Sequence, residues 1–141
     1  MIKIMVSVSD NKSYPIWITE DFTGLADAVS GTGLSKRKVC VVTETNVAPY
    51  YLNEVMRSLS EVSSYVSSFV FKAGEDSKTL DTVMKLYEHL IVEHFERRDI
   101  LVALGGGVTG DLTGYTAATY LRGIGYIQIP TSLLAQVDSS I

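Results

Sequence analysis

The first residues of the chain alternate between apolar and mostly polar positions. Every second residue from Ile2 to Val8 is isoleucine or valine, and this period of two is typical of a half-exposed strand. The polar segment 9–13 has the composition of a turn, and Ile16–Ile18 resumes the apolar pattern. The pattern therefore predicts a β-hairpin over residues 2–19.

After the hairpin, short apolar runs alternate with segments of helical periodicity. The runs that predict buried strands are Val39–Val42, Tyr65–Phe71, Ile100–Leu104 and Tyr126–Pro130. The helical segments are Gly24–Val29, Leu52–Leu59, Leu80–His94, a segment from the glycines after Leu104 to near Leu121, and a short helix through Gln136. This order predicts a Rossmann-like α/β fold. It has an N-terminal β-hairpin and a mostly parallel sheet with helices on both faces.

A glycine-rich turn follows the strand 100–104. Gly105, Gly107 and Gly110 have the spacing G-x-G-x-x-G, which brings backbone N–H groups at a helix start close to an anion. The usual dinucleotide fingerprint also has an acid about 20 residues later, where this chain has Pro130 and Thr131. Spacing alone therefore leaves nucleotide binding and a tight structural turn equally open.

An acid, Asp111, directly follows the last glycine of this turn. In the first turn of a helix a carboxylate has a simple explanation, because it interacts favourably with the helix dipole. Beside a pyrophosphate it needs another partner, such as a hydroxyl or a ribose. The helix also carries Gly110, Gly114 and Ala118 at intervals of four, a small-residue face that allows close approach to the sheet.

Polar residues follow the other predicted strands as well. Ligands of open parallel sheets bind outside the carboxyl ends of the strands, so Glu44 and Asn46 are candidates for contacts with ribose or adenine. The alternative is that Thr45 or Asn46 caps the next helix. The loop 73–78 and Thr131 with Ser132 would lie at the same edge, and the last two can also cap the final helix.

Composition and charge exclude several classes of function. The 141 residues suit one domain, and a net charge of −4 without clustered Lys and Arg argues against a nucleic-acid surface. No apolar run approaches the roughly 18 residues of a membrane span, and no signal peptide is recognised. The single cysteine, Cys40, lies in a predicted strand and suits core packing in a reducing compartment. We therefore expect a soluble cytoplasmic protein.

Metal binding by this chain is not expected. His89 and His94 are five residues apart and point to different sides of a helix, so they cannot share a metal from one face. The chain contains no complete metal-binding motif.

Four motifs together carry a resemblance to a known family. They are Gly74-Glu75-x-x-Lys78, Gly105–Asp111, Ala118–Gly123 and Gln128–Ser140. In this order and spacing the chain resembles 3-dehydroquinate synthase, and it corresponds to the N-terminal, NAD-binding half of that family. Thr131-Ser132 replaces a frequent Thr-Thr, and Ala73 stands where an acid is common.

The resemblance implies a lyase of the shikimate pathway and of aromatic amino acid biosynthesis. Such enzymes convert 3-deoxy-D-arabino-heptulosonate 7-phosphate to 3-dehydroquinate with loss of phosphate. NAD⁺ transiently oxidises a carbinol, and a divalent metal, zinc or cobalt, polarises its oxygen.

The resemblance also implies roles for individual residues. Asp138 would bind substrate hydroxyls, and Arg122 would reach the substrate phosphate from the partner subunit, so a homodimer is implied. The residues that would contact NAD are Glu44, Asn46, Glu75, Lys78, Gly106, Gly107, Val108, Asp111, Thr131 and Ser132.

The family continues beyond the motif at Asp138 with Gly-Gly-Lys and an all-helical lobe that supplies the metal ligands. We therefore expect residues 1–141 to be an NAD-binding domain that has no synthase activity alone. Two alternatives remain open. One is another sugar-phosphate cyclase or a polyol dehydrogenase of the same superfamily, and the other is a non-catalytic NAD-binding module.

Overall fold

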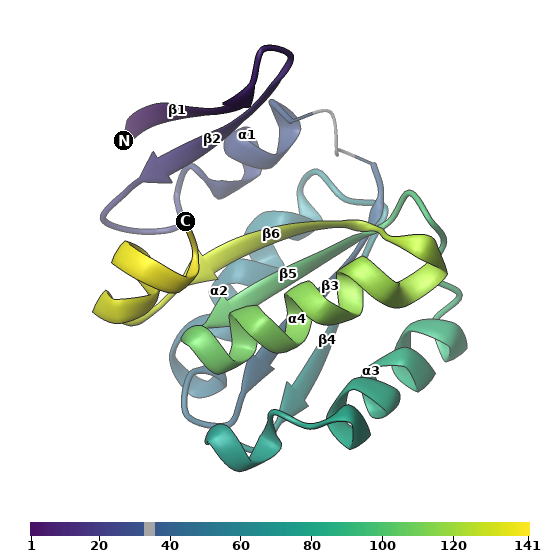
Figure 1. Cartoon of the computed structure of the whole chain (residues 1–141). Coiled ribbons are helices and arrows are strands. Elements are labelled where there is room, and N and C mark those ends of the chain that lie inside the picture. The colour runs from purple at the N-terminus through teal and green to yellow at the C-terminus, as the bar shows by residue number, and fades with distance from the viewer. Residues whose placement is uncertain (33–35) are drawn as a thin grey trace.

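The computed structural model describes residues 1–32 and 36–141, and within them a parallel sheet carries helices on both faces (Figure 1). The sheet order is β4-β3-β5-β6, and all neighbouring strands are parallel. The strands are β3 (Lys38–Glu44), β4 (Tyr65–Phe71), β5 (Ile100–Gly105) and β6 (Gly125–Pro130). The predicted Rossmann-like architecture is confirmed.

Two helices cover each face of the sheet. On one face lie α1 (Leu25–Ser30) and α2 (Ala48–Ser60), which bury Val29, Val55 and Leu59 against odd-numbered residues of β3. On the other lie α3 (Leu80–Val92) and α4 (Gly107–Thr119). Because side chains alternate along a strand, the central strands contribute to both cores. The strand β5 is buried throughout, and β3 is buried except at its two ends.

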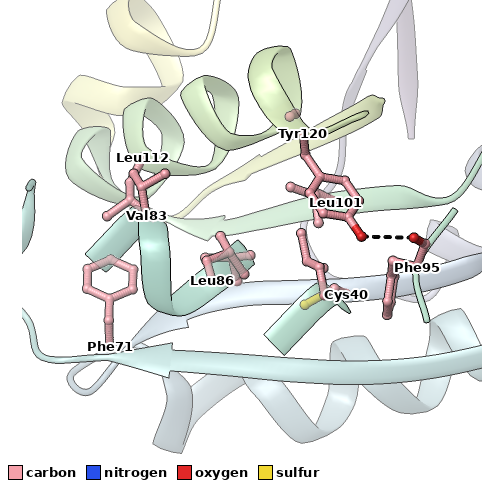
Figure 2. Close-up of a cluster of buried hydrophobic side chains, with 11 residues drawn as sticks. Cys40, Phe71, Val83, Leu86, Phe95, Leu101, Leu112 and Tyr120 are labelled. Atoms are coloured by element: carbon pink, nitrogen blue, oxygen red, sulfur yellow. Dashed lines mark hydrogen bonds between the residues drawn. The ribbon is translucent and has the colours of Figure 1, made fainter. Parts of the chain in front are cut away.

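Figure 2 shows the core beneath α3 and α4. Leu86 and Leu112 come from the two helices and meet Leu101 and Cys40 of the sheet. The hydroxyl of Tyr120 donates a hydrogen bond of 2.9 Å to the carbonyl of Phe95, which ties the end of α4 to the segment after α3. This core fixes both helices on the sheet.

Two members of the predicted small-residue face of α4, Gly110 and Gly114, lie against β6, whereas the third, Ala118, is exposed. A Cβ added at Gly110 would stand 2.9 Å from the side-chain oxygen of Gln128, and one at Gly114 would stand 3.3 Å from the hydroxyl of Tyr126. A larger residue at either position would displace the side chain of Gln128 or Tyr126, or move the helix away from the strand. The glycines therefore set the height of α4 above the sheet.

The predicted hairpin is formed by β1 (Ile2–Ser9) and β2 (Lys12–Ile18), which pair antiparallel and stand apart from the main sheet (Figure 1). In the described part of the chain, no helix is long and apolar enough to cross a membrane.

Several predicted helix ends are wrong. The cap of α2 is Val47, without a side-chain hydrogen bond, so neither Thr45 nor Asn46 caps it. The α3 helix ends at Val92, because His94 has a φ of 56°. The predicted end of the next helix near Leu121 is confirmed, because α4 runs to Thr119 and η2 (Tyr120–Arg122) continues it.

At the end of the chain, Ser132 Oγ accepts a hydrogen bond of 3.2 Å from the N–H of Ala135, as expected for a cap. The helical turns continue as η3 (Ala135–Ser139) beyond the predicted end at Gln136.

Cys40 and His89 have structural positions. Cys40 is fully buried in β3, and burial raises the pKa of its thiol to about 12, so core packing is confirmed. His89 Nε2 lies 3.2 Å from Ser67 Oγ. Among residues 1–32 and 36–141, no three His, Cys, Asp or Glu side chains are grouped to hold a metal ion.

Candidate functional site

The carboxyl ends of the strands form one edge of the sheet. Glu44 is paired with Phe71, and Gly105 with Pro130, so the segments that follow these strands emerge together. They include the loop 73–78, the glycine turn and Thr131, as the parallel topology predicts. This edge brings most of the candidate residues into one region.

The glycine turn joins β5 directly to α4. Gly106 is the cap residue of α4 and makes no side-chain cap hydrogen bond. The first N–H groups of a helix have no partner within it, so those of the first turn of α4 are available to a ligand. Because these groups carry a partial positive charge, the turn suits an anion such as a phosphate.

The turn is closely packed on its inner side. The N–H of Thr131 donates a hydrogen bond of 3.0 Å to the carbonyl of Gly105, which links the ends of β5 and β6. A Cβ at Gly105 would stand 2.4 Å from Thr109 Oγ1, so no other residue fits there without a shift. The backbone of the turn is therefore held in one position.

Two serine hydroxyls border the turn. Ser132 Oγ lies 3.5 Å from the position a Cβ would take at Gly106, and Ser139 Oγ lies 3.4 Å from that at Gly107. Ser132 is a predicted site residue, whereas Ser139 is not. Ser139 belongs to the last sequence motif, but the sequence does not show that it lies near Gly107. The path of η3 brings its hydroxyl there.

Lys78 connects the loop 73–78 to α4. Its ammonium lies 2.9 Å from Asp111 Oδ2 and 3.4 Å from Glu75 Oε1. The nearby Asp111 carboxylate, followed by Glu75, raises the pKa of the Lys78 ammonium above its usual value. The three predicted residues therefore form one charged cluster.

Asp111 is the fifth residue of α4 and lies beyond its first turn. The sequence suggested that this carboxylate interacts favourably with the helix dipole. That interaction is not its main role, because the effect of the dipole falls off after the first turn. Its carboxylate instead pairs with Lys78.

The segment after β3 is held by local hydrogen bonds. The N–H of Asn46 donates to Glu44 Oε2 at 2.8 Å, and the N–H of Ala73 donates to Thr45 Oγ1 at 3.0 Å. Thr45 thus links the loops after β3 and β4. Glu44 is half-buried and the side chain of Asn46 is exposed at the edge.

Arg122 lies away from this edge. It follows α4, whose 13 residues span about 20 Å, and it precedes the first residue of β6. Asp138 lies beyond the carboxyl end of β6, on the side of the glycine turn. The exposed guanidinium of Arg122 and the carboxylate of Asp138 are therefore at opposite ends of the domain.

The arrangement fits a dinucleotide in its chemistry. Backbone N–H groups can hold a pyrophosphate, hydroxyls stand beside them, and the charged cluster at Lys78 and Asp111 can meet ribose oxygens or phosphate. Gly106 and Gly107 carry no side chain, which allows a ligand to approach their backbone closely.

Comparison with known proteins places the chain in a family. The model of a family described as 3-dehydroquinate synthase N-terminal matches residues 68–141. The 3-dehydroquinate synthase of Acetivibrio thermocellus is 45% identical over 141 residues, which are 100% of this chain and 39% of that protein. That of Clostridium kluyveri is 45% identical over 92% of this chain and 36% of its own length. The chain thus spans about two fifths of the curated relatives that it matches.

Solved structures show the same fold. A 2-deoxy-scyllo-inosose synthase, crystallised with carbaglucose-6-phosphate, NAD⁺ and Co²⁺, superposes with a TM-score of 0.87 at 27% identity, over 98% of this chain and 37% of that one. The 2-epi-5-epi-valiolone synthase ValA of Streptomyces hygroscopicus, with NAD⁺ and Zn²⁺ bound, gives 0.73 at 25% identity over 96% of this chain and 37% of that chain.

The close contact at Gly105 makes a prediction about stability. Replacing Gly105 with alanine forces its Cβ against Thr109, so we expect the free energy of unfolding to fall by about 1–3 kcal/mol. Gly125→Ala is the matched control, because no atom lies within 4 Å of its added Cβ. Urea unfolding measures both, and equal stabilities of the two variants would contradict the described packing.

Proposed function

The chain belongs to the 3-dehydroquinate synthase family, and we propose that it forms the NAD-binding part of such an enzyme. The proposed reaction converts 3-deoxy-D-arabino-heptulosonate 7-phosphate to 3-dehydroquinate and releases phosphate. The observation that carries this proposal is the glycine turn, which presents the first N–H groups of α4 beside Ser132, with Lys78 paired to Asp111 further along the helix. As a carbon–oxygen lyase, the enzyme would serve the shikimate pathway in the cytoplasm.

In this proposal the chain binds and orients the cofactor. The N–H groups of Gly106, Gly107 and Val108 would hold the pyrophosphate. Glu44 and Asn46 would contact the adenosine part from the end of β3, and Glu75 with Lys78 from the loop after β4. Asp111 would join them through the cluster at Lys78.

The reacting end of the cofactor would lie beside Thr131 and Ser132. When bound, NAD⁺ supplies the hydride acceptor for transient oxidation of the substrate carbinol. Asp138, exposed after β6, would orient the substrate by accepting hydrogen bonds from its hydroxyls. These residues position substrate and cofactor against each other, which is the main contribution of a protein to cofactor chemistry.

The divalent metal of the reaction, zinc or cobalt, would be held elsewhere. The described residues of this chain contain no suitable cluster, and the longer relatives leave about three fifths of their length for a second lobe. We propose that this lobe carries the metal ligands and the remaining substrate contacts.

The first prediction from this proposal concerns activity. The 141-residue chain, supplied with substrate, NAD⁺ and zinc, is expected to release no phosphate above a blank without protein. The measurement is a phosphate-release assay, with a complete 3-dehydroquinate synthase as the positive control. Turnover by the chain alone would show that its own residues suffice, and the proposed division into two lobes would be wrong.

The second prediction concerns NAD. Lys78→Met removes the cation that pairs with Asp111 of α4. If Lys78 contacts NAD⁺ as proposed, we expect the Kd of the chain for NAD⁺ to rise roughly tenfold, which is the effect of one lost good contact. Lys72→Met makes the same change of charge at an exposed lysine on the same strand–loop segment and is expected to leave the Kd unchanged. Isothermal titration calorimetry compares them. An equal loss in both variants would indicate a general effect of charge instead of a contact.

Arg122 requires a second subunit in this proposal. Its distance from Asp138 along α4 prevents both side chains from serving one substrate within a single domain. We propose that the protein is a homodimer in which Arg122 binds the substrate phosphate in the site of the partner. Arginine suits this role because its planar fork matches phosphate oxygens.

Subunit mixing tests this arrangement in the longer protein. Arg122→Ala and Asp138→Asn should each abolish activity alone. A mixed dimer would contain one intact site, so an equimolar mixture should recover about a quarter of the wild-type activity. No recovery, in mixtures shown to exchange subunits, would place Arg122 and Asp138 in the same subunit's site and contradict the proposal.

A further inference from the structure

The turn after α4 holds two residues in an unfavourable backbone conformation. Leu121 and Arg122 have φ of 48° and 67°, in the left-handed region that residues other than glycine rarely adopt. Gly123 follows with a φ of 107°, which glycine adopts readily. A strained conformation of this kind persists only where the surrounding structure fixes it. The contacts around the turn therefore decide where the exposed side chain of Arg122 is presented.

Two backbone hydrogen bonds close this turn. The N–H of Gly123 donates to the carbonyl of Tyr120 at 2.9 Å, and the N–H of Ile124 donates to the carbonyl of Ala117 at 2.7 Å. Both bonds join residues that are close in sequence, so neither connects the turn to another part of the sheet or to α3. A segment held only by local bonds can open without unfolding the rest of the domain.

The side chain of Tyr120 supplies the long-range contact. It is 7% exposed, and its hydroxyl donates a hydrogen bond of 2.9 Å to the carbonyl of Phe95, in the segment after α3 (Figure 2). Its ring stacks on that of Tyr87 of α3, with the ring centres 6.1 Å apart. Burial, followed by the nearby Asp99 carboxylate, raises the pKa of the Tyr120 hydroxyl above its usual value. The hydroxyl therefore remains a donor at neutral pH.

The acceptor of this bond is itself held in place. The ammonium of Lys38, the first residue of β3, donates to the carbonyls of the two residues that precede Phe95, at 2.9 and 3.1 Å. The Asp99 carboxylate accepts hydrogen bonds from the N–H groups of Lys38 at 3.0 Å and Glu96 at 2.7 Å. The segment is thus fastened to the sheet on both sides of Phe95, and its carbonyl offers Tyr120 a fixed anchor.

We propose that Tyr120 is a positioning residue for Arg122. The bond from its hydroxyl to the Phe95 carbonyl holds the strained turn in the conformation that presents the guanidinium. The inference rests on the proposed function, in which Arg122 binds the substrate phosphate. The planar fork of an arginine matches phosphate oxygens only in certain orientations, so a backbone that is fixed before binding avoids the cost of ordering it. Tyr120 acts through the turn, because its own hydroxyl is buried and occupied.

Amide hydrogen exchange of the 141-residue chain tests this anchoring without substrate or NAD. Tyr120→Phe removes the hydroxyl and keeps the ring. Relative to the amides of β5, we expect the amides of Gly123 and Ile124 to exchange roughly tenfold faster than in the wild type, because the turn opens more often.

The matched control for this exchange experiment is Thr116→Val. The Thr116 hydroxyl is also buried and also donates to a backbone carbonyl, that of Leu112 at 2.8 Å, but this bond lies within α4. Its loss should leave the exchange at Gly123 and Ile124 unchanged relative to β5. Unchanged exchange in Tyr120→Phe, or an equal increase in both variants, would overturn the inference.

Steady-state kinetics of the longer protein test the consequence for the site. We expect Tyr120→Phe to raise the KM for the heptulosonate phosphate roughly tenfold, because a loosely held Arg122 binds phosphate less well. The KM for NAD⁺ should stay unchanged, and Thr116→Val should change neither constant. A purely structural role of Tyr120 would lower the amount of active enzyme and leave both KM values unchanged, which would contradict the inference.

A double-mutant cycle shows whether the effect passes through Arg122. Arg122→Lys keeps the charge and removes the fork. In this background Tyr120→Phe should raise the KM for the substrate clearly less than it does alone, since the geometry that Tyr120 maintains is no longer used. Fully additive effects would show that Tyr120 acts on the KM by another route, and the inference would be wrong.

Failure of this inference and failure of the proposed function give different results. If exchange at the turn does not respond to Tyr120→Phe while the mixture of Arg122→Ala and Asp138→Asn recovers activity, the anchoring is wrong and the proposed function stands. If exchange responds but the mixture recovers no activity, the anchoring of the turn stands and the role of Arg122 is wrong.

Discussion

The close approach of backbones at the glycine turn is the constraint on which the rest of the site depends. There is no room for a side chain at Gly105, where Thr109 already occupies the space, and the carbonyl of Gly105 also holds Thr131. These contacts join the ends of β5 and β6 to the start of α4. The N–H groups of α4, Ser132 and the end of the chain therefore have fixed positions relative to one another.

The two ends of the domain differ in their chemistry. The carboxyl edge collects glycines, hydroxyls and the cluster at Lys78 and Asp111, which suit a phosphate-containing cofactor. The amino edge carries Arg122. Both Leu121 and Arg122 have positive φ angles, of 48° and 67°. Non-glycine residues in this region are costly and are often found at functional positions. The α4 helix, held close to β6 by Gly110 and Gly114, sets the distance between the two ends.

Much of this fold can be predicted from local patterns, and the site only in part. Periodicity places β4 at its observed bounds and identifies the hairpin. It does not predict the burial of β1, whose apolar residues are exposed apart from the half-buried Val6. It fails at the cap of α2, where Val47 begins the helix without a side-chain bond. It also does not reveal that Asp111 pairs with Lys78 or that Ser139 borders Gly107, because both contacts join segments distant in sequence and depend on the tertiary fold.

The central claim is that the start of α4 binds the pyrophosphate of NAD through its backbone. Titration of the ¹⁵N-labelled chain with NAD⁺, followed by amide chemical shifts, tests it most directly. The account predicts that the amide signals of Gly106, Gly107 and Val108 shift most, together with signals of the loop around Lys78. Unchanged signals for these three amides at NAD⁺ concentrations that saturate the chain would contradict it.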